Sequence, residues 1–418
     1  MYLTQKNHVR NLTKQEYLIL RLLTKLSKNL FNVTNYTIRQ YYELNNKFLR
    51  YESAYHLVKN NDNYKHLPAQ IAQQTMRVVD RSFRSFFSVL TQKRKGNYDK
   101  PVNIPSFLPF NEYFPCIFSQ GNFKVMEDGR LRLSLGQWIT KEYGTRYIYF
   151  KIPPNVTGHA IKEIRILPQF RGNFFEIEYV YWRDPIPTDL DADKVMGIDL
   201  GLDNFATCTS TSGTSFVIEG KGLKSYNCWW NKQRAKLQST YAKNGVKFGK
   251  KMYFLNQKRK HKLNEFLNQS VNYIVKQCIV EKIGNVAIGE LKDIKQHGHL
   301  GHKTNQHFQS IPYYLFKQKL ASKCELYGIA YQEVDEACTS QTCYKCGRVR
   351  KANRIHRGLY RCDACGIVVN ADTNGSINIG NQVAPESNQI GSSGVVNAPY
   401  RVTLISFGVT KPTETPAL

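Results

Sequence analysis

Residues 343–375 read CYKCGRVRKANRIHRGLYRCDACGIVVNADTNG, two cysteine pairs followed by an aspartate. Two residues separate the cysteines of each pair, and fifteen separate the pairs. Four thiolates at this spacing can close a tetrahedron around Zn²⁺, and such a site folds a segment too short to have its own core. We therefore predict one structural zinc ion held by Cys343, Cys346, Cys362 and Cys365. Only six residues then lead to Asp372, so the zinc module is expected to be an insert directly ahead of a functional carboxylate.

Two further carboxylates end apolar runs upstream of the zinc segment. Asp199 lies in VMGIDLG (195–201), and Glu290 ends VAIGE (286–290). Each acid alone could be a surface or capping residue. Together with Asp372 at a helix start capped by Asn370, they are typical of a divided site in which carboxylates hold two Mg²⁺ ions for phosphodiester hydrolysis. We predict that Asp199, Glu290 and Asp372 converge as catalytic magnesium ligands.

The formal net charge of +27, from 59 Lys+Arg and 32 Asp+Glu, makes a polyanion the expected partner. Nucleic acid is the default, and a membrane surface is the rival. No stretch approaches the ~20 apolar residues of a spanning helix, and the N-terminus lacks a signal-peptide pattern. The cysteines outside the quartet are scattered, which fits a reducing cytoplasm, where we expect them to be small buried hydrophobes.

The N-terminal half predicts helices followed by strands. A capping box at 13–16 opens one helix, and a second is expected over 69–92. From 115 to 182 the pattern changes to short strands, which we interpret as a small β-barrel, and 185–193 is typical of a linker. Arg77, Arg81 and Arg84 share one helix face, which is either solvated or in contact with phosphates.

The second half alternates buried strands with basic helices. Residues 204–209 and 215–218 are expected to pair antiparallel beside the strand that carries Asp199. Residues 220–264 contain thirteen Lys/Arg, no acidic residue and interleaved aromatics, which indicates nucleic-acid binding rather than a merely solvated helix pair. The candidate contacts there are Arg234, Lys236, Lys250, Lys251, Lys258 and Arg259. Helices are further expected over 262–282 and 312–327, and the segment 383–418 is expected to be disordered.

A histidine-rich stretch, His297 to His307, lies between the strand ending at Glu290 and the helix over 312–327. Its glycines and its spacing favour a flexible loop over the active site that touches nucleic acid. A second metal-ligand cluster is the alternative.

The motifs VMGIDLG (195–201), IGEL (288–291), TSQTCYKCG (339–347) and NADTNGSINI (370–379) resemble the TnpB family of transposon-encoded, RNA-guided DNA endonucleases, relatives of type V CRISPR effectors. The resemblance implies a multidomain α+β and α/β fold. Its expected parts are a wedge-like β-barrel (1–30 plus 100–185), a helical recognition domain (31–99), a RuvC-like, RNase H-like nuclease domain (193–336 plus 367–382) and a zinc-knuckle insert (337–366). Ala371 departs from relatives that have a basic residue there, and the loop after Glu290 is shorter than in many.

The resemblance also implies a guide RNA from the transposon end, double-stranded target DNA and a monomer acting in a prokaryotic cytoplasm, at the nucleoid. The expected function is an RNA-guided, Mg²⁺-dependent endonuclease that cuts double-stranded DNA beside a short flanking motif. A transposase that transfers DNA strands is an alternative, because it uses similar acidic triads. A cleavage-deficient, RNA-guided repressor is another, against which the intact acids argue.

Overall fold

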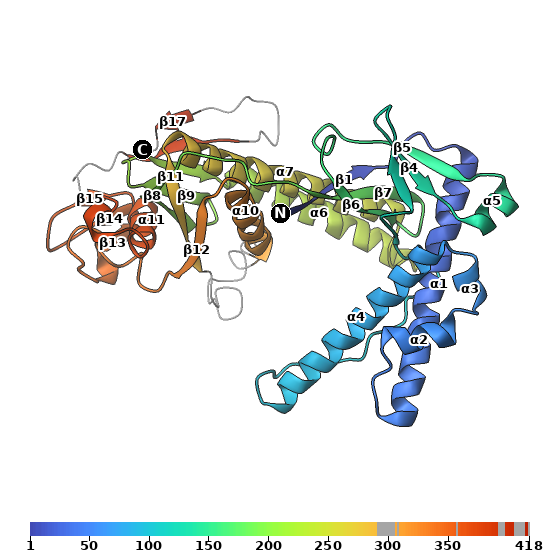
Figure 1. Cartoon of the computed structure of the whole chain (residues 1–418). Coiled ribbons are helices and arrows are strands. Elements are labelled where there is room, and N and C mark those ends of the chain that lie inside the picture. The colour runs from blue at the N-terminus through green and yellow to red at the C-terminus, as the bar shows by residue number, and fades with distance from the viewer. Residues whose placement is uncertain (291–305, 307–308, 357, 392–397, 405–413, 417–418) are drawn as a thin grey trace. The chain divides into compact units, whose positions relative to one another are not determined.

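The computed structural model describes residues 1–290, 306, 309–356, 358–391, 398–404 and 414–416. It divides into two compact units, Met1–Arg183 and Asp184–Leu418 (Figure 1). Each unit has its own buried apolar core. The mixed helix–strand, multidomain fold expected from the sequence is therefore confirmed.

The helices of the first unit begin where the sequence supplies a cap. Thr13 Oγ1 accepts the Glu16 amide at 3.2 Å, and the Glu16 carboxylate accepts the Thr13 amide at 2.8 Å, so the predicted capping box is present. Ile19, Leu23 and Leu30 on the first helix are buried together with Ile71, Met76 and Phe83 on the fourth. The helices are α1 (Lys14–Asn45), α2 (Tyr51–Val58), α3 (Asp62–Lys65), α4 (Ala69–Arg94) and α5 (Gln137–Tyr143).

The strands of the first unit form two antiparallel sheets, in the orders β1-β7-β6-β2 and β3-β4-β5. No closed barrel is seen among the described strands of this unit, where a small barrel was expected. The strands are β1 (Tyr2–His8), β2 (Cys116–Ser119), β3 (Phe123–Val125), β4 (Arg130–Ser134), β5 (Tyr147–Lys151), β6 (Ile161–Gln169) and β7 (Phe174–Trp182).

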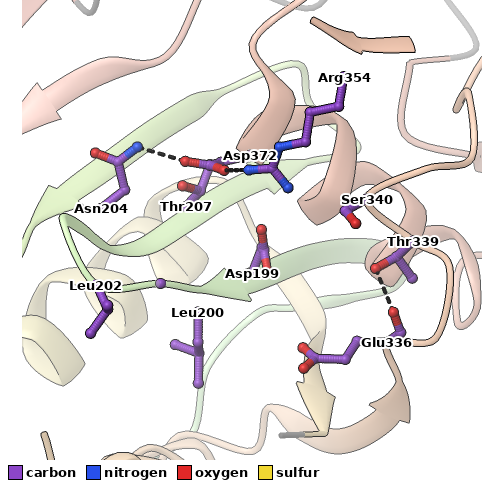
Figure 2. Close-up of a pocket in the computed structure, with 11 residues that line it drawn as sticks. Asp199, Leu200, Leu202, Asn204, Thr207, Glu336, Thr339, Ser340, Arg354 and Asp372 are labelled. Carbon is purple, nitrogen blue, oxygen red and sulfur yellow. Dashed lines mark hydrogen bonds and ion pairs between the residues drawn. The ribbon is translucent and has the colours of Figure 1, made fainter. Parts of the chain in front are cut away.

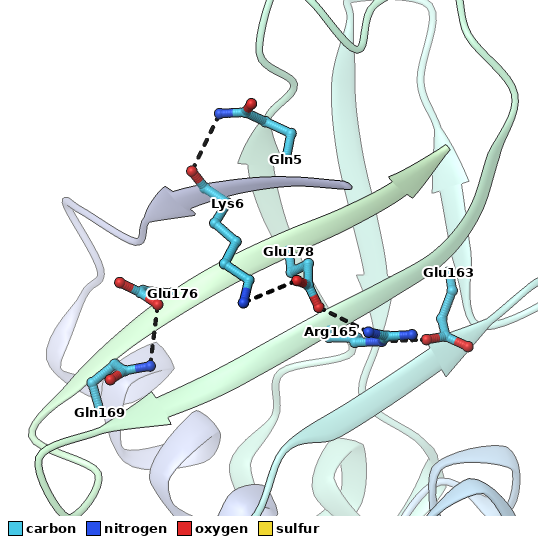
Figure 3. Close-up of polar contacts among 7 residues, drawn as sticks. All are labelled: Gln5, Lys6, Glu163, Arg165, Gln169, Glu176 and Glu178. Carbon is cyan, nitrogen blue, oxygen red and sulfur yellow. Dashed lines mark hydrogen bonds and ion pairs between the residues drawn. The ribbon is translucent and has the colours of Figure 1, made fainter. Parts of the chain in front are cut away.

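A row of charged residues crosses the first sheet (Figure 3). Glu178 on the central strand β7 is in register with Lys6 on one side and Arg165 on the other. Its carboxylate lies 3.1 Å from Lys6 Nζ and 3.0 Å from an Arg165 guanidinium nitrogen. Opposite charges directly across a strand pair stabilise that pairing, and a shift of one residue would separate them. This row therefore favours the observed register of β1, β7 and β6.

The second unit is built on a seven-stranded sheet with the order β12-β11-β8-β9-β10-β16-β17. The predicted antiparallel pairing of β9 and β10 beside β8 is confirmed. Strand β16 pairs parallel with β10 and buries Val402, so the prediction of disorder is wrong for these residues. The strands are β8 (Asp191–Leu200), β9 (Asn204–Ser210), β10 (Ser215–Glu219), β11 (Ile283–Glu290), β12 (Ala330–Asp335), β16 (Tyr400–Val402) and β17 (Glu414–Pro416).

Helices cover both faces of this sheet. Phe266 of α7 and Phe316 of α10 share a core with Met196 and Ile198 of β8, whereas Val195 packs with Ile379 of α11 on the other face. The helices are α6 (Lys221–Lys243), α7 (Lys250–Val280), α10 (Tyr313–Leu326) and α11 (Ala371–Asn381). Among the helices described, none is long and apolar enough to cross a membrane.

Candidate active site

The side chain of Asp199 lies on the face of the sheet that α11 covers. Successive strand residues point to opposite faces, and Met196 and Ile198 belong to the core under α7 and α10. Val195, Gly197 and Asp199 therefore face α11. Asp199 is the last of the three, near the end of β8.

Two glycines let α11 approach β8 closely. A Cβ atom at Gly197 would lie 2.0 Å from the Ser376 carbonyl oxygen, and one at Gly375 would lie 2.9 Å from an Asp199 carboxylate oxygen. A side chain at Gly197 would force the helix away from the sheet, because it would meet backbone atoms of α11, whereas one at Gly375 would displace the Asp199 carboxylate. The glycines thus bring the start of α11, which carries Asp372, to the Asp199 carboxylate.

Asp372 is held at the first turn of α11 by three polar neighbours, of which Figure 2 shows Asn204 and Arg354. The Asn370 side chain caps the helix and accepts the Asp372 amide at 3.0 Å. One Asp372 carboxylate oxygen accepts the Asn204 amide group at 2.7 Å, and the other lies 3.0 Å from an Arg354 guanidinium nitrogen. The carboxylate is therefore oriented from both the sheet and the zinc segment.

Asp199, Asp372 and Glu336 line one pocket of about 260 Å³ (Figure 2). Burial, followed by the negative charges of Asp372 and Glu336, raises the pKa of Asp199 to about 8, and the Arg354 guanidinium opposes this shift. Burial also raises the pKa of Glu336 to about 7, against the opposing charge of Lys317. The pocket thus concentrates more negative charge than its own cations offset.

Glu290, the third predicted acid, does not line this pocket. Ala287 on β11 is in register with Gly197, and Ile288 with Ile198. The alternation therefore puts Gly289 on the Asp199 face and directs Glu290 toward the other. A Cβ atom at Gly289 would lie 2.5 Å from a Glu336 carboxylate oxygen, so the Glu336 side chain occupies the space over that glycine.

Glu336 is a pocket residue that sequence reasoning missed. It follows directly after β12, which pairs parallel with β11, so both strands end at the same edge of the sheet. Its position in the sequence could have identified it, because it is an acid that follows a predicted strand. It also lies three residues before Thr339, which begins the TSQTC motif.

The donor set of the pocket fits a hard divalent cation. Mg²⁺ prefers carboxylate oxygens and keeps several waters, so a few acids from different elements suffice. Burial and the neighbouring carboxylates raise the pKa of Asp199, and a bound cation would favour its ionised form. Across the described residues, however, the cysteine quartet is the one group of three or more His, Cys, Asp or Glu side chains placed closely enough to hold a metal ion. The carboxylates of the pocket do not form such a group.

The cysteine quartet has the geometry of a zinc site. All four Sγ atoms lie within 4.8 Å of one another, and the Cys343–Cys365 and Cys346–Cys362 pairs are both 3.6 Å apart. Tetrahedral Zn–S bonds of about 2.3 Å require sulfurs about 3.8 Å apart. Backbone amides, first that of Cys365, lower the pKa of Cys362 to about 7, whereas burial raises the pKa of Cys343 to about 12.

The zinc segment is attached to α11 by side-chain amides. The segment contains η1 (Lys351–Asn353) and the small sheet β13 (Arg354–His356), β14 (Leu359–Arg361) and β15 (Val368–Val369). Asn374 donates to the Thr342 carbonyl at 2.7 Å, and Asn378 donates to the Thr339 carbonyl at 2.8 Å. The first cysteine knuckle is therefore bound to the helix that carries Asp372.

The predicted arginine contacts of the first unit lie together on α4. Arg77, Arg81 and Arg84 line a surface pocket of about 320 Å³. Arg77 lies over the Tyr51 ring at 4.9 Å, and Arg84 pairs with Asp80 at 2.7 Å. All three arginines are exposed, and the charge of Arg84 is partly neutralised by Asp80.

The predicted contacts on α6 and α7 differ in exposure. The Arg259 guanidinium is half-buried, donates to Asn227 and to the Ser310 carbonyl, and lies 4.3 Å from the Trp230 ring centroid, so it joins elements of the protein. Burial, then the charge of Arg234, lowers the pKa of Arg259. The remaining candidates are exposed: Arg234, Lys236, Lys250, Lys251 and Lys258.

The histidine-rich stretch from His297 to His307 lies outside the described residues except for Gln306. Its role remains a prediction.

Two family models match successive parts of the chain. OrfB_IS605, described as a probable transposase, matches residues 178–295. The Cas12f1-like TNB domain matches residues 313–379, which include the zinc segment and Asp372.

Curated relatives resemble the same region and, in some cases, most of the chain. The Cas12f1 endodeoxyribonuclease of Sulfoacidibacillus thermotolerans is 29% identical over 53% of this chain and 53% of its own length. The chain thus spans about half the length of that relative. The putative RNA-guided DNA endonuclease InsQ of Escherichia coli (strain K12) is 24% identical over 75% of this chain and 74% of its own. The TnpB-like protein ORF457 of Acidianus two-tailed virus is 24% identical over 86% of this chain and 82% of its own length.

Solved structures share the fold. The chain resembles Cas12f1 from a Cas12f1–sgRNA–target DNA complex, with a TM-score of 0.65, 16% identity, and coverage of 88% of this chain and 83% of that one. It also resembles the mini-RNA-guided endonuclease CRISPR-Cas phi3, with a TM-score of 0.53, 12% identity and 92% coverage of both chains.

Proposed function

We propose that this chain, a homologue of the TnpB-like and Cas12f1 proteins, is an RNA-guided, metal-dependent endonuclease that cleaves double-stranded DNA beside a short flanking motif. The observation that carries the proposal is the meeting of Asp199, Asp372 and Glu336 in one pocket. These acids come from a strand, a helix start and the segment after a strand, which are remote along the chain. A shared desolvated site is the arrangement that metal-dependent phosphodiester hydrolysis needs.

Asp199 and Asp372 would hold the catalytic magnesium ions, and the third ligand would come from Glu290, as the resemblance implies, or from Glu336. When bound, two such ions activate a water and stabilise the leaving oxygen of the phosphodiester. Asn204 and Arg354 orient Asp372 through its two oxygens. Arg354 also supplies a fixed positive charge where a phosphate would enter.

The basic surface of the chain would hold the guide RNA and its DNA target. The helical segment 31–99, with the arginines of α4, and the strands of 1–30 and 100–185 would read the flanking motif and the guide. This division of labour leaves sequence recognition to base pairing and follows RNA-guided effectors in general. The site of action would be the nucleoid of a prokaryotic cytoplasm.

Purified protein with its co-purifying RNA, Mg²⁺ and a plasmid target tests the proposal. Sequencing that RNA supplies the target sequence. Cleavage should require the matching sequence and should disappear when the RNA is digested before the complex is assembled. Cleavage or strand joining that ignores this digestion would instead favour a transposase, the activity named in the OrfB_IS605 description.

Asp199→Ala separates catalysis from binding. It should slow Mg²⁺-dependent cleavage by at least about a hundredfold, because it removes a charge that acts on the transition state. RNA affinity should change by less than about twofold, because phosphate contacts supply it. Equal cleavage by the variant and the wild type would remove the site assignment.

A further inference from the structure

The side-chain amide of Asn204 lies between the Asp372 carboxylate and an arginine of the C-terminal segment. Its Nδ2 donates to Asp372 Oδ2 at 2.7 Å, the contact drawn in Figure 2. Its Oδ1 accepts from Arg401 Nη1 at 3.2 Å. Arg401 lies on β16, in a segment expected from the sequence to be disordered, and the two family matches end before it, at residues 295 and 379. The sequence motifs therefore do not account for this contact.

The sheet directs the Arg401 side chain to the face that carries Asp199. Val402 is buried in the core under α7 and α10, and Tyr400 packs against the same core. Because side chains alternate along a strand, Arg401 between them points to the opposite face, which α11 covers. The parallel pairing of β16 with β10 places Arg401 in register with Val217. Strand pairing thus brings a residue from the end of the chain to the pocket of Asp199.

Glu219 at the end of β10 anchors the Arg401 guanidinium. The same Nη1 atom that donates to Asn204 lies 3.3 Å from Glu219 Oε1. The other Glu219 oxygen accepts the Thr403 hydroxyl at 2.9 Å, which holds the carboxylate in place. The side chains of Arg401 and Glu219 are only 24% and 22% exposed, so water screens their charges incompletely. The guanidinium is therefore held at a defined position beside the amide.

The charges on its two sides select one orientation of the Asn204 amide. A side-chain amide has an oxygen that only accepts hydrogen bonds and an NH₂ group that only donates them. Arginine is always protonated in proteins, so Arg401 can only donate. The reverse orientation would place the amide oxygen against the Asp372 carboxylate and the NH₂ group against the guanidinium, and both contacts would be repulsive. Arg401 therefore keeps the NH₂ group of Asn204 directed at Asp372.

We propose that Arg401 is a positioning residue of the nuclease site, which orients the Asp372 carboxylate through Asn204. The inference rests on the proposed function and deepens it, because it makes the C-terminal segment a working part of the site. Replacing a group that orients a metal ligand through a hydrogen bond costs about 10- to 100-fold in metal affinity or activity. Arg354 still contacts the other Asp372 oxygen, so we expect a loss at the lower end of this range.

Arg401→Met tests the contact, because methionine preserves much of the side-chain volume and has no donor. We expect the full chain with its RNA to cleave target DNA about tenfold more slowly in single turnover at saturating Mg²⁺. Arg401→Lys keeps the charge and a donor and should lose less than about threefold. Tyr400→Phe is the matched control on the other face of the same strand. It removes a hydroxyl that lies 3.2 Å from the Tyr273 hydroxyl and should cleave at the wild-type rate.

A double-mutant cycle separates positioning from a purely structural role. If Arg401 acts through Asn204, Arg401→Met should slow cleavage by less than about twofold once Asn204→Ala is present. A role only in holding β16 against β10 would instead slow both backgrounds equally. Equal losses in the two backgrounds, or a wild-type rate for Arg401→Met, would overturn the proposal. If Arg401→Met does not fold, Glu219→Gln loosens the guanidinium without changing β16, and its effect should likewise vanish beside Asn204→Ala.

Metal affinity supplies a measurement that does not depend on cleavage. Mn²⁺, as a probe for the magnesium site, is titrated calorimetrically into the full chain, and Asp199→Ala gives the heat of ions bound elsewhere. We expect the pocket of Arg401→Met to bind Mn²⁺ about tenfold more weakly than that of the wild type. Equal affinity would contradict the proposal and leave the proposed function standing. A wild type that does not cleave would instead remove the proposed function, and the Mn²⁺ comparison would still test Arg401.

Discussion

Glu290 and Glu336 are both acids at the ends of adjacent parallel strands, yet of the two only Glu336 lines the pocket of Asp199 and Asp372. Side chains along β11 alternate between the two faces of the sheet, so Gly289, and not Glu290, lies on the face that carries the Asp199 side chain. Gly289 has no side chain, and Glu336 lies over it. At the scale of single residues, the composition of the pocket is therefore decided by which face of a strand each side chain occupies.

Substitution of each glutamate measures its share of catalysis. We expect Glu336→Gln to slow cleavage by about ten- to a hundredfold, because it removes a charge from the pocket while preserving the side-chain volume. The TnpB resemblance predicts a comparable loss for Glu290→Gln. The measurement is the single-turnover cleavage rate at saturating Mg²⁺.

Glu325→Gln, an exposed change on α10, is the control for these variants. A wild-type rate for Glu336→Gln would remove Glu336 from the site. A wild-type rate for Glu290→Gln would remove Glu290 from the ligand set.

At the scale of elements, the site depends on α11 and on what holds it against the sheet. Gly197 admits the helix, and Asn370 caps it. Asn374 and Asn378 bind it to the first cysteine knuckle. The zinc segment is thus a support of the helix that carries Asp372.

Gly197→Ala tests the close contact of α11 with β8. The added methyl would collide with the Ser376 carbonyl, so α11 has to move. We expect a loss of about 1–3 kcal/mol in the free energy of unfolding, measured by urea denaturation, and slower cleavage, because Asp372 moves away from Asp199. Unchanged stability and rate would show that the helix does not lie this close.

Cys362→Ser tests the zinc site. The variant should lose zinc, measured by elemental analysis, and thermal stability together, because metal binding folds this segment. Cleavage should fall as well, since the knuckle supports α11. A variant with full zinc content would point to a different ligand set, such as one that includes His356. The control is Cys338→Ser, which changes an exposed cysteine outside the quartet and should retain zinc.

At the scale of the whole molecule, charge and architecture are separable. The net charge of +27 predicts which molecules the chain attracts but does not specify its fold. The fold of the second unit, in contrast, is stabilised by apolar strand residues that pack against helices on both faces of the sheet.

Salt dependence tests the role of the overall charge. If RNA is held mainly through phosphates, its affinity should fall on the order of a thousandfold between about 50 and 200 mM salt. Asp199→Ala should show the same slope of log affinity against log salt, measured by filter binding. A flat slope would show that the basic surface does not hold the RNA.

Sequence patterns alone were enough to find the cysteine quartet, the capping box of α1 and the strands around Asp199, and to predict a nucleic-acid partner, because spacing, alternation and net charge are local or additive properties. They also identified Asp199 and Asp372, which the structure brings into one pocket. The folded structure was needed to show that Glu336 lines the same pocket, that the half-buried Arg259 donates to the Ser310 carbonyl, and that residues 400–402 pair with β10. These depend on which strand faces meet and which distant segments pack together, and side-chain contacts between remote residues leave no periodic signal along a single chain.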